Sequence, residues 1–190
     1  MENYNSYIGR LDYSKFIQFA KDKGKVHIYH KKDFFIEQNK VSDQVGWIET
    51  GAFRYVHTDK HGKEHVVEYS FANEFVCDYS SFIHQSTSLV HIQAMSECVV
   101  YLLSYQDIVA YLETDMETLR FGKQTVDALY EMMYKRYLEL YCDSPEESYL
   151  KLMQRCPDLK EIAPLKEIAS YLRVTPTTAV SYTHLRAHET

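Results

Sequence analysis

The side chains of this 190-residue sequence that are most suited to chemistry are its nine histidines and four cysteines. The cysteines lie far apart and form no C-x-x-C pair, so metal-ligand and redox spacing is absent. Scattered thiols of this kind indicate free cysteines in an intracellular protein. The four are Cys77, Cys98, Cys142 and Cys156.

Three histidines, His57, His61 and His65, straddle one predicted turn. His57 and His65 could face each other across a hairpin and bind a metal, but solvated turn histidines are the commoner case. Metal-dependent jelly-roll enzymes place histidines at strand spacing such as H-x-H, and no such pair occurs. The sequence also lacks a nucleophile elbow, a phosphate loop and a carboxylate dyad. We therefore expect that the protein is not an enzyme and holds no metal.

The spacing of apolar residues changes along the chain, and this spacing predicts the elements that carry the histidines and cysteines. A short helix containing Phe16 and Ala20 precedes Gly24. From 26 to about 104, short runs rich in Val, Ile, Tyr and Phe alternate with turn signals, which predicts antiparallel strands without intervening helices. The clearest hairpin is "FRYVHTDKHGKEHVVEYSF", in which Gly62 can adopt the positive φ that a tight turn needs. This pattern predicts an α+β protein with an antiparallel β jelly roll or barrel.

A long helix is predicted over 115–143, because apolar residues recur at spacings of three and four on one stripe. The stripe could pack against the β block, but it continues well past that block in sequence. We favour a seam that pairs two copies of the chain in a homodimer. The proposed seam residues are Val126, Leu129, Met133, Tyr137 and Leu140.

The segment "LKEIASYLRVTPTTAV" has the pattern of two short helices joined by a turn. Leu165, Ile168, Ala169 and Leu172 form a buried stripe, and Thr175-Pro176 has the pattern of an N-cap followed by the first helical residue. An ordinary helical hairpin has the same features. In a helix-turn-helix, the early residues of the second helix reach base edges while other contacts bind phosphate. The candidate DNA contacts are Arg173, Thr175, Thr177 and Thr178.

The net charge and the apolar runs of the sequence constrain the partners of the protein only weakly. The net charge of −6 excludes a surface that is basic throughout but leaves room for a local basic patch. No apolar run approaches the ~18 residues of a spanning helix, and the amino terminus has no signal-peptide core. We therefore expect a cytoplasmic protein without a membrane partner.

The order of these parts resembles the family of the catabolite activator protein, the Crp-Fnr regulators. The matching stretches run from about Lys25 to Thr178 and include Gly51 at the glycine that usually precedes a strand. They are "KKDFFIEQNKVSDQVGWIETGAFRYV", "DKHGKEHVVEYSFANEFVCDYSSF", "SPEESYLKLMQRCPDL" and "LKEIASYLRVTP". The resemblance implies a transcription regulator that binds a small effector in the β domain, pairs through the long helix and reads a palindromic site with a winged helix-turn-helix. Candidate effector-pocket residues are Glu74, Phe75, Tyr79 and Ser88.

Departures from the family pattern bear on its ligands. Members that bind cyclic nucleotides carry a Gly-Glu pair and a later Arg-Ser pair, where the arginine neutralises the cyclic phosphate. Here the first pair is Asn73-Glu74, and "HQSTSLVHIQA" contains no arginine, so we expect no tight cAMP binding. Iron–sulfur members cluster cysteines near the amino terminus, whereas the first cysteine here is Cys77, so no cluster is expected. Haem would need an axial ligand, and nothing in the sequence distinguishes one of the nine histidines for this role. The sequence does not identify the effector.

The expected division is an effector domain over 1–114, a dimerisation helix over 115–143 and a partial helix-turn-helix over 144–178. The stretch "AVSYTHLRAHET" over 179–190 departs from the family, which continues with an arginine-bearing helix and a β-hairpin wing. It resembles translated linker sequence, and we interpret it as a non-native tail. We therefore expect weak or no specific DNA binding. The alternative function is an effector-binding dimerisation module that has lost DNA binding.

Overall fold

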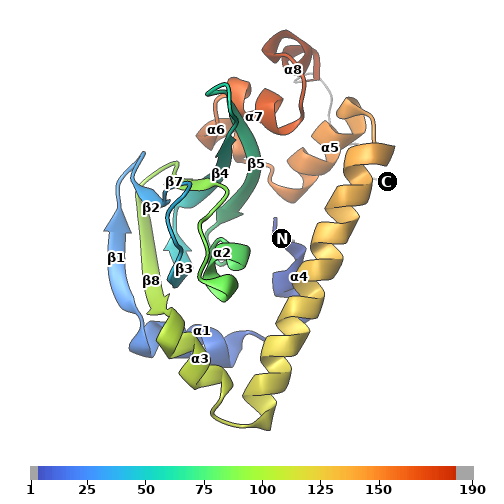
Figure 1. Cartoon of the computed structure of the whole chain (residues 1–190). Coiled ribbons are helices and arrows are strands. Elements are labelled where there is room, and N and C mark those ends of the chain that lie inside the picture. The colour runs from blue at the N-terminus through green and yellow to red at the C-terminus, as the bar shows by residue number, and fades with distance from the viewer. Residues whose placement is uncertain (1–3, 183–190) are drawn as a thin grey trace.

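The computed structural model describes residues 4–182 and places a two-sheet β domain beside one long helix (Figure 1). The sheets are antiparallel, with strand orders β1-β8-β3-β6 and β2-β7-β4-β5. The predicted α+β fold with an antiparallel β domain is confirmed. The strands are β1 (Lys25–Tyr29), β2 (Phe34–Ile36), β3 (Gln44–Thr50), β4 (Ala52–Thr58), β5 (Glu64–Phe71), β6 (Phe75–Val76), β7 (His91–Ala94) and β8 (Cys98–Ser104).

The β4–β5 hairpin forms where the sequence predicts it, with His57 opposite His65. Gly62 has φ +78° in the turn, the left-handed conformation that favours glycine. Asp59 fixes the turn, because its carboxylate accepts hydrogen bonds from the backbone N–H groups of His61 and Lys63 at 2.8 and 3.1 Å. The hairpin is therefore an ordered element that projects from the sheet.

The space between the two sheets is filled by side chains. Ile48, Phe53, Ile92 and Val100 are fully buried there, and they alternate with outward-facing residues as the pleat requires. Gly51 turns the chain from β3 into β4 with φ +94°, and a Cβ at this position would meet the sulfur of Cys98 at 2.5 Å. This glycine is required both by its backbone conformation and by the lack of space.

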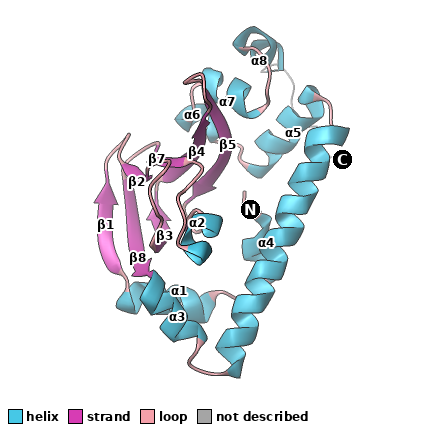
Figure 2. Cartoon of the chain, in the orientation of Figure 1, coloured by secondary structure: helices cyan, strands magenta, loops and turns pink. Residues whose placement is uncertain are grey.

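The helices lie around the β domain, with several grouped at the carboxyl-terminal end of the chain (Figure 2). The 3-10 helix η1 covers Ser6–Arg10. The α-helices are α1 (Ser14–Lys23), α2 (Tyr79–His84), α3 (Tyr105–Leu112), α4 (Met116–Cys142), α5 (Pro145–Arg155), α6 (Leu159–Ile162), α7 (Leu165–Tyr171) and α8 (Pro176–Tyr182).

Helix α2 corrects the prediction of a β block without helices. It interrupts the strands between β6 and β7, and its amino terminus is capped by Asp78, whose side chain accepts a hydrogen bond from Ser81 N at 3.3 Å. The composition of "YSSFIH" is strand-like, so the helix depends on this cap and on the burial of Phe82 rather than on intrinsic propensity.

Helix α4 is the long helix of the prediction, and it begins at a capping box. Asp115 accepts from Thr118 N at 2.8 Å, and the Thr118 hydroxyl accepts from Asp115 N in return. One face buries Ala128 and Met132 against Tyr7 and Tyr13 from the amino-terminal segment. This face attaches the helix to the amino-terminal segment of its own chain.

The carboxyl-terminal helices pack onto the second sheet and do not stand apart from it. Tyr149, Leu152 and Ile168 share one hydrophobic cluster with Val66 and Tyr69 of β5. Helix α5 begins at a capping box, because the Ser144 hydroxyl accepts from Glu147 N at 3.2 Å and the Glu147 carboxylate accepts in return from Ser144 N. Strand β5 therefore joins the β domain to the helix pair α7–α8.

Candidate functional site

Glu74, the first of the predicted effector-pocket residues, is a buried carboxylate satisfied by its own chain. It lies in the β5–β6 turn with 1% of its surface exposed. It accepts from the backbone N–H of Asn5 at 2.7 Å, from the Asn5 carboxamide at 2.6 Å and from Phe71 N at 3.0 Å. Burial raises its pKa above the ordinary value, and these donors oppose the rise.

The other three predicted pocket residues have separate sets of neighbours. Phe75 stacks edge-on against Trp47 with ring centroids 4.9 Å apart, and Ser88 is fully buried and donates to the Asp78 carboxylate at 2.6 Å. Tyr79 is exposed at the start of α2. Phe75 and Ser88 are thus occupied by structural contacts, and the proposed pocket stays a prediction.

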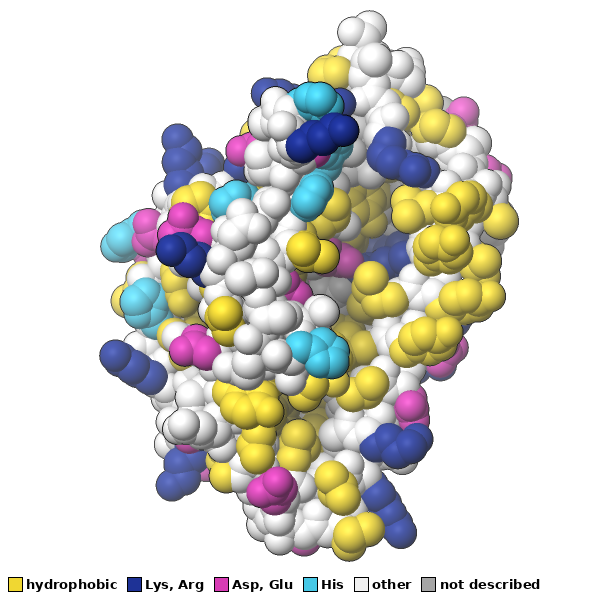
Figure 3. Space-filling model, viewed as in Figure 1, with side chains coloured by type: hydrophobic (Ala, Val, Ile, Leu, Met, Phe, Trp, Pro, Cys, Tyr) yellow, Lys and Arg dark blue, Asp and Glu magenta, His cyan; other side chains and the backbone are white. Residues whose placement is uncertain are grey.

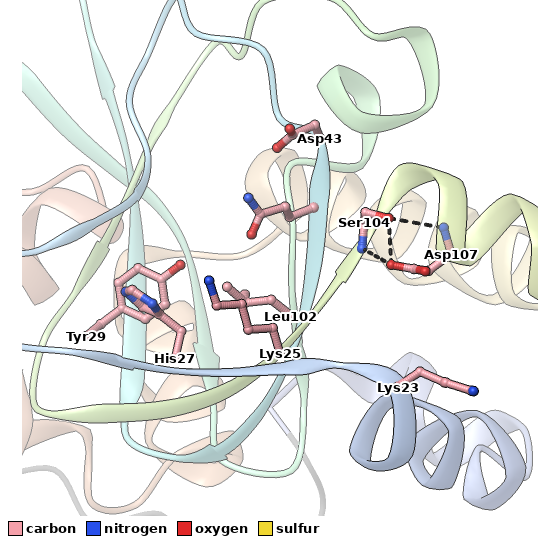
Figure 4. A pocket seen from close by; sticks show the side chains of 9 residues that line it. Lys23, Lys25, His27, Tyr29, Asp43, Leu102, Ser104 and Asp107 are labelled. Carbon is pink, nitrogen blue, oxygen red and sulfur yellow. Dashed lines mark hydrogen bonds between the residues drawn. The ribbon is translucent and has the colours of Figure 1, made fainter.

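A hollow that the sequence did not indicate lies along β1, with a volume of about 400 Å³. Every second residue of β1 projects to the same side, and these residues are Lys25, His27 and Tyr29 (Figure 4). Burial, reinforced by a nearby aspartate, raises the pKa of Tyr29 to about 12. The hollow is lined by two lysines, Lys23 and Lys25, and by two aspartates, Asp43 and Asp107, so it offers mixed hydrogen bonding without a dominant charge.

The histidines of the hairpin are held by contacts within the hairpin and a nearby loop. The Nδ1 of His57 lies 2.7 Å from Leu89 O, and the Nε2 of His65 lies 2.9 Å from the Asp59 carboxylate. The hydrogen bond with His65 is the largest cause that lowers the pKa of Asp59 to about 2. Within residues 4–182, no group of three or more His, Cys, Asp or Glu side chains is arranged to hold a metal ion.

The four cysteines are all free thiols and do not meet one another. Cys98 is buried beneath Gly51, and Cys142 is exposed at the end of α4. Burial raises the pKa of the Cys156 thiol to about 11 and raises that of Cys77 further. A raised pKa disfavours the thiolate, so these two cysteines have the character of packing residues.

The helix pair α7–α8 has the geometry that the sequence predicts at its turn. Thr175 caps α8, because its hydroxyl accepts from Thr178 N at 3.1 Å. Arg173 has φ +57°, and its guanidinium donates to Leu140 O at the end of α4 at 2.8 Å. Arg173, Thr175 and Thr177 are exposed, and Thr178 is half-buried. Three of the four candidate DNA contacts are therefore accessible, but the guanidinium of Arg173 is partly used within the chain.

A groove of about 1340 Å³ separates the β4–β5 hairpin from α7 and α8. Its walls include Lys63 and His65 on the hairpin and Arg173, Thr175 and Thr178 on the helix pair. The groove was not predicted, because its two walls are about 100 residues apart in sequence and meet only through tertiary packing.

Two polar contacts hold α7 to the sheet at the base of this groove. The hydroxyl of Ser170 accepts from Val66 N at 3.0 Å, and Arg54 forms an ion pair with Glu167 at 2.6 Å. Burial raises the pKa of Glu167, and the charge of Arg54 acts against that rise. The position of the helix pair relative to the hairpin is therefore set by specific side chains.

A second apolar face of α4 points away from the chain. Val126, Met133, Tyr137 and Leu140 are between 40% and 54% exposed, whereas Leu129 is half-buried against the amino-terminal cluster. At 100° per residue, this face lies about 120° around the helix from the face that buries Ala128 and Met132. Figure 3 shows hydrophobic side chains gathered along the upper part of α4. A contiguous exposed apolar stripe of this length is typical of a protein–protein contact.

The stretch 179–190 lies partly inside the described structure. Residues 179–182 belong to the stretch interpreted as a non-native tail, and they continue α8. Ala179 is fully buried, and the ring centroids of Tyr182 and Tyr149 are 5.8 Å apart. Residues 183–190 lie outside the described part of the chain.

Over residues 4–182, no helix combines the length and the apolar character needed to cross a membrane.

The fold is an antiparallel two-sheet β domain followed by the long helix α4 and a carboxyl-terminal group of short helices. The chain belongs to the cyclic nucleotide-binding domain family, whose model matches residues 26–130. No curated protein matches the chain.

Solved structures share this fold over most of the chain. FixK2 from Bradyrhizobium japonicum is 13% identical with a TM-score of 0.71, covering 84% of this chain and 82% of its own. The c-di-GMP-responsive global regulator CLP from Xanthomonas campestris is 15% identical with a TM-score of 0.63, covering 89% of each chain. A CooA mutant from Carboxydothermus hydrogenoformans is 17% identical with a TM-score of 0.63, covering 95% of this chain and 82% of its own. At these identities the likeness establishes the fold.

Proposed function

We propose that the chain is a dimeric transcription regulator of the Crp-Fnr type and not an enzyme. In this proposal the β domain over 1–114 binds a small effector, the helix over 115–143 pairs two copies, and the helices from 144 onward contact DNA. The observation that carries the proposal is the capped helix pair α7–α8 packed on a sensor-type β domain. A regulator of this kind works where the DNA is, in the cytoplasm.

The dimer seam is supported by the second apolar face of α4. Two copies packed through Val126, Met133, Tyr137 and Leu140 would bury side chains that water now reaches. The pairing would also place two α8 helices on one side of the assembly. Recognition helices in such dimers enter successive major grooves about 34 Å apart and read a palindrome.

The proposed DNA contacts are Arg173, Thr175, Thr177 and Thr178. Threonine hydroxyls can accept and donate at base edges and phosphates but discriminate bases weakly, and Arg173 would supply the positive charge. Helix α8 itself, over Pro176–Tyr182, brings no lysine or arginine. We therefore expect the binding to be weak and strongly dependent on salt.

The absence of basic residues from α8 also favours the alternative, a sensing and dimerising module that does not bind DNA. A mobility-shift titration of the full-length chain with genomic fragments at low and moderate salt separates the two functions. A regulator loses affinity steeply as salt rises, because each neutralised phosphate releases counterions. If no fragment shifts even at low salt, only the module remains.

The proposed effector is not cAMP. The acceptors of Glu74 are engaged by Asn5 and Phe71, and "HQSTSLVHIQA" offers no arginine for a cyclic phosphate. Calorimetric titration with cAMP is expected to show no tight binding. A micromolar or tighter constant would contradict this part of the proposal.

A further inference from the structure

The amino-terminal segment over residues 4–10 is bound to the β domain through a buried polar site. Glu74 is a carboxylate at 1% exposure, and its hydrogen-bond partners are three N–H donors. Asn5 supplies two of the three and is itself only 4% exposed. Its carboxamide also donates to Tyr69 O at 3.1 Å. An ionised carboxylate is costly to bury without such donors, so the site at Glu74 requires an occupant.

Tyr4, the neighbour of Asn5, reaches three further elements. Its ring packs edge-on against Phe71 at 5.3 Å between centroids, and the guanidinium of Arg136 on α4 lies 4.5 Å from the ring centroid. Its carbonyl accepts from Arg136 at 2.8 Å. Its hydroxyl donates to the hydroxyl of Tyr171, the last residue of α7, at 3.0 Å. One dipeptide therefore touches the β domain, the long helix and the helix pair.

We propose that Glu74 and the β5–β6 turn form a binding site for a peptide amide, that the chain's own Asn5 occupies it, and that Tyr4 transmits this occupancy to α7. The ligand class is an uncharged group that presents a backbone N–H together with a carboxamide, as asparagine does. When Asn5 is seated, Tyr4 is held beside Arg136 and Tyr171, and the carboxyl-terminal end of α7 is tied to the amino-terminal segment. When Asn5 leaves, the Tyr4–Tyr171 contact is lost and the end of α7 is released.

The first test is hydrogen exchange on the full-length chain carrying Asn5→Ala. The variant removes the carboxamide donor to a buried charge, and such hydrogen bonds correspond to a change of about tenfold or more in a local opening equilibrium. We expect at least tenfold faster exchange in segments 4–10 and 165–172, with β3 and β8 still protected. Unchanged protection of 4–10 would overturn the occupancy of the site. General loss of protection, including β3 and β8, would make Asn5 an ordinary stabilising residue and would also overturn the proposal.

The second test is Tyr4→Phe, which removes only the hydroxyl that contacts Tyr171 and keeps the ring. We expect exchange in segment 165–172 to rise by about threefold to tenfold, while segment 4–10 stays protected by Asn5. Unchanged exchange in 165–172 would overturn transmission to α7.

Arg10→Ala is the matched control for both variants. It lies in the same segment, and its ion pair with Glu131 is half exposed on both sides, so exchange in 165–172 should not change. None of these measurements uses DNA. The exchange measurements therefore test this inference independently of whether the chain binds DNA.

Discussion

Replacing Met133 by aspartate on the exposed face of α4 should convert the proposed dimer into a monomer. The Met133 side chain is 54% exposed in the single chain, so pairing would bury about the second half of it. Full burial of a methionine is worth roughly 1.5–3 kcal/mol, which gives about 1 kcal/mol for each copy and about 2 kcal/mol for each dimer. Two carboxylates brought together in the seam would add about 2 kcal/mol more through desolvation and repulsion.

The sum of about 4 kcal/mol corresponds to a rise of roughly a thousandfold in the dissociation constant. Sedimentation equilibrium over a series of concentrations measures this constant directly for the original chain and for Met133→Asp. A pair of 22.4 kDa chains weighs twice that mass, so the two states are well separated.

Gln124→Asp is the control for this comparison. Gln124 is exposed on the same helix, and at 100° per residue it lies on the opposite side from Met133. The same new charge at this position should leave the dissociation constant within a few-fold of the original. If Met133→Asp dimerises as tightly as Gln124→Asp, the seam lies elsewhere or does not exist.

Three further substitutions test other parts of the account. Arg136→Met should lower the free energy of unfolding by about 2–3 kcal/mol, because it strands Glu68 in a pair that is 12% and 19% exposed, and adding Glu68→Gln should recover part of the loss in urea unfolding. Asp59→Asn should be less stable than the original chain at neutral pH. The pKa of Asp59 is lowered from 3.8 to about 2, so its stabilisation is present above pH 3.8 and disappears as the pH falls through 2, and thermal melts of the two chains should converge there. Arg173→Gly should raise stability by up to about 1 kcal/mol in the same melts, because relief of the left-handed strain at φ +57° outweighs the loss of the exposed hydrogen bond to Leu140 O. A decrease would contradict the strain argument.

Features set by a few neighbouring residues could be predicted from the sequence. The Ser144-Pro145 and Thr175-Pro176 starts, the positive φ of Gly62 and the long helix are determined by local capping, turn chemistry and apolar spacing. The left-handed conformation of Arg173 in the turn of the helix pair has no such local signal, because glycine is the residue that adopts it without strain.

Features that depend on pairs distant in sequence could not be predicted. The Asn5–Glu74 site joins residues 69 apart, and no local pattern marks Asn5 as a ligand. Helix α2 was missed because its residues favour strands, and only Asp78 and the burial of Phe82 make it helical. The same limit applies to the groove beside the hairpin, because periodicity indicates which face is apolar but not which element covers it.

The measurement that tests the central claim most directly is the salt dependence of DNA binding by the full-length chain. Fragments selected from genomic DNA should shift at low salt with a dissociation constant on the order of micromolar, and the affinity should fall by at least tenfold between about 50 mM and 200 mM salt. The selected fragments should contain two-fold symmetric half-sites one helical turn apart. Absence of any shift at low salt, with the dimer intact, would contradict the account and leave a sensing module without a DNA partner.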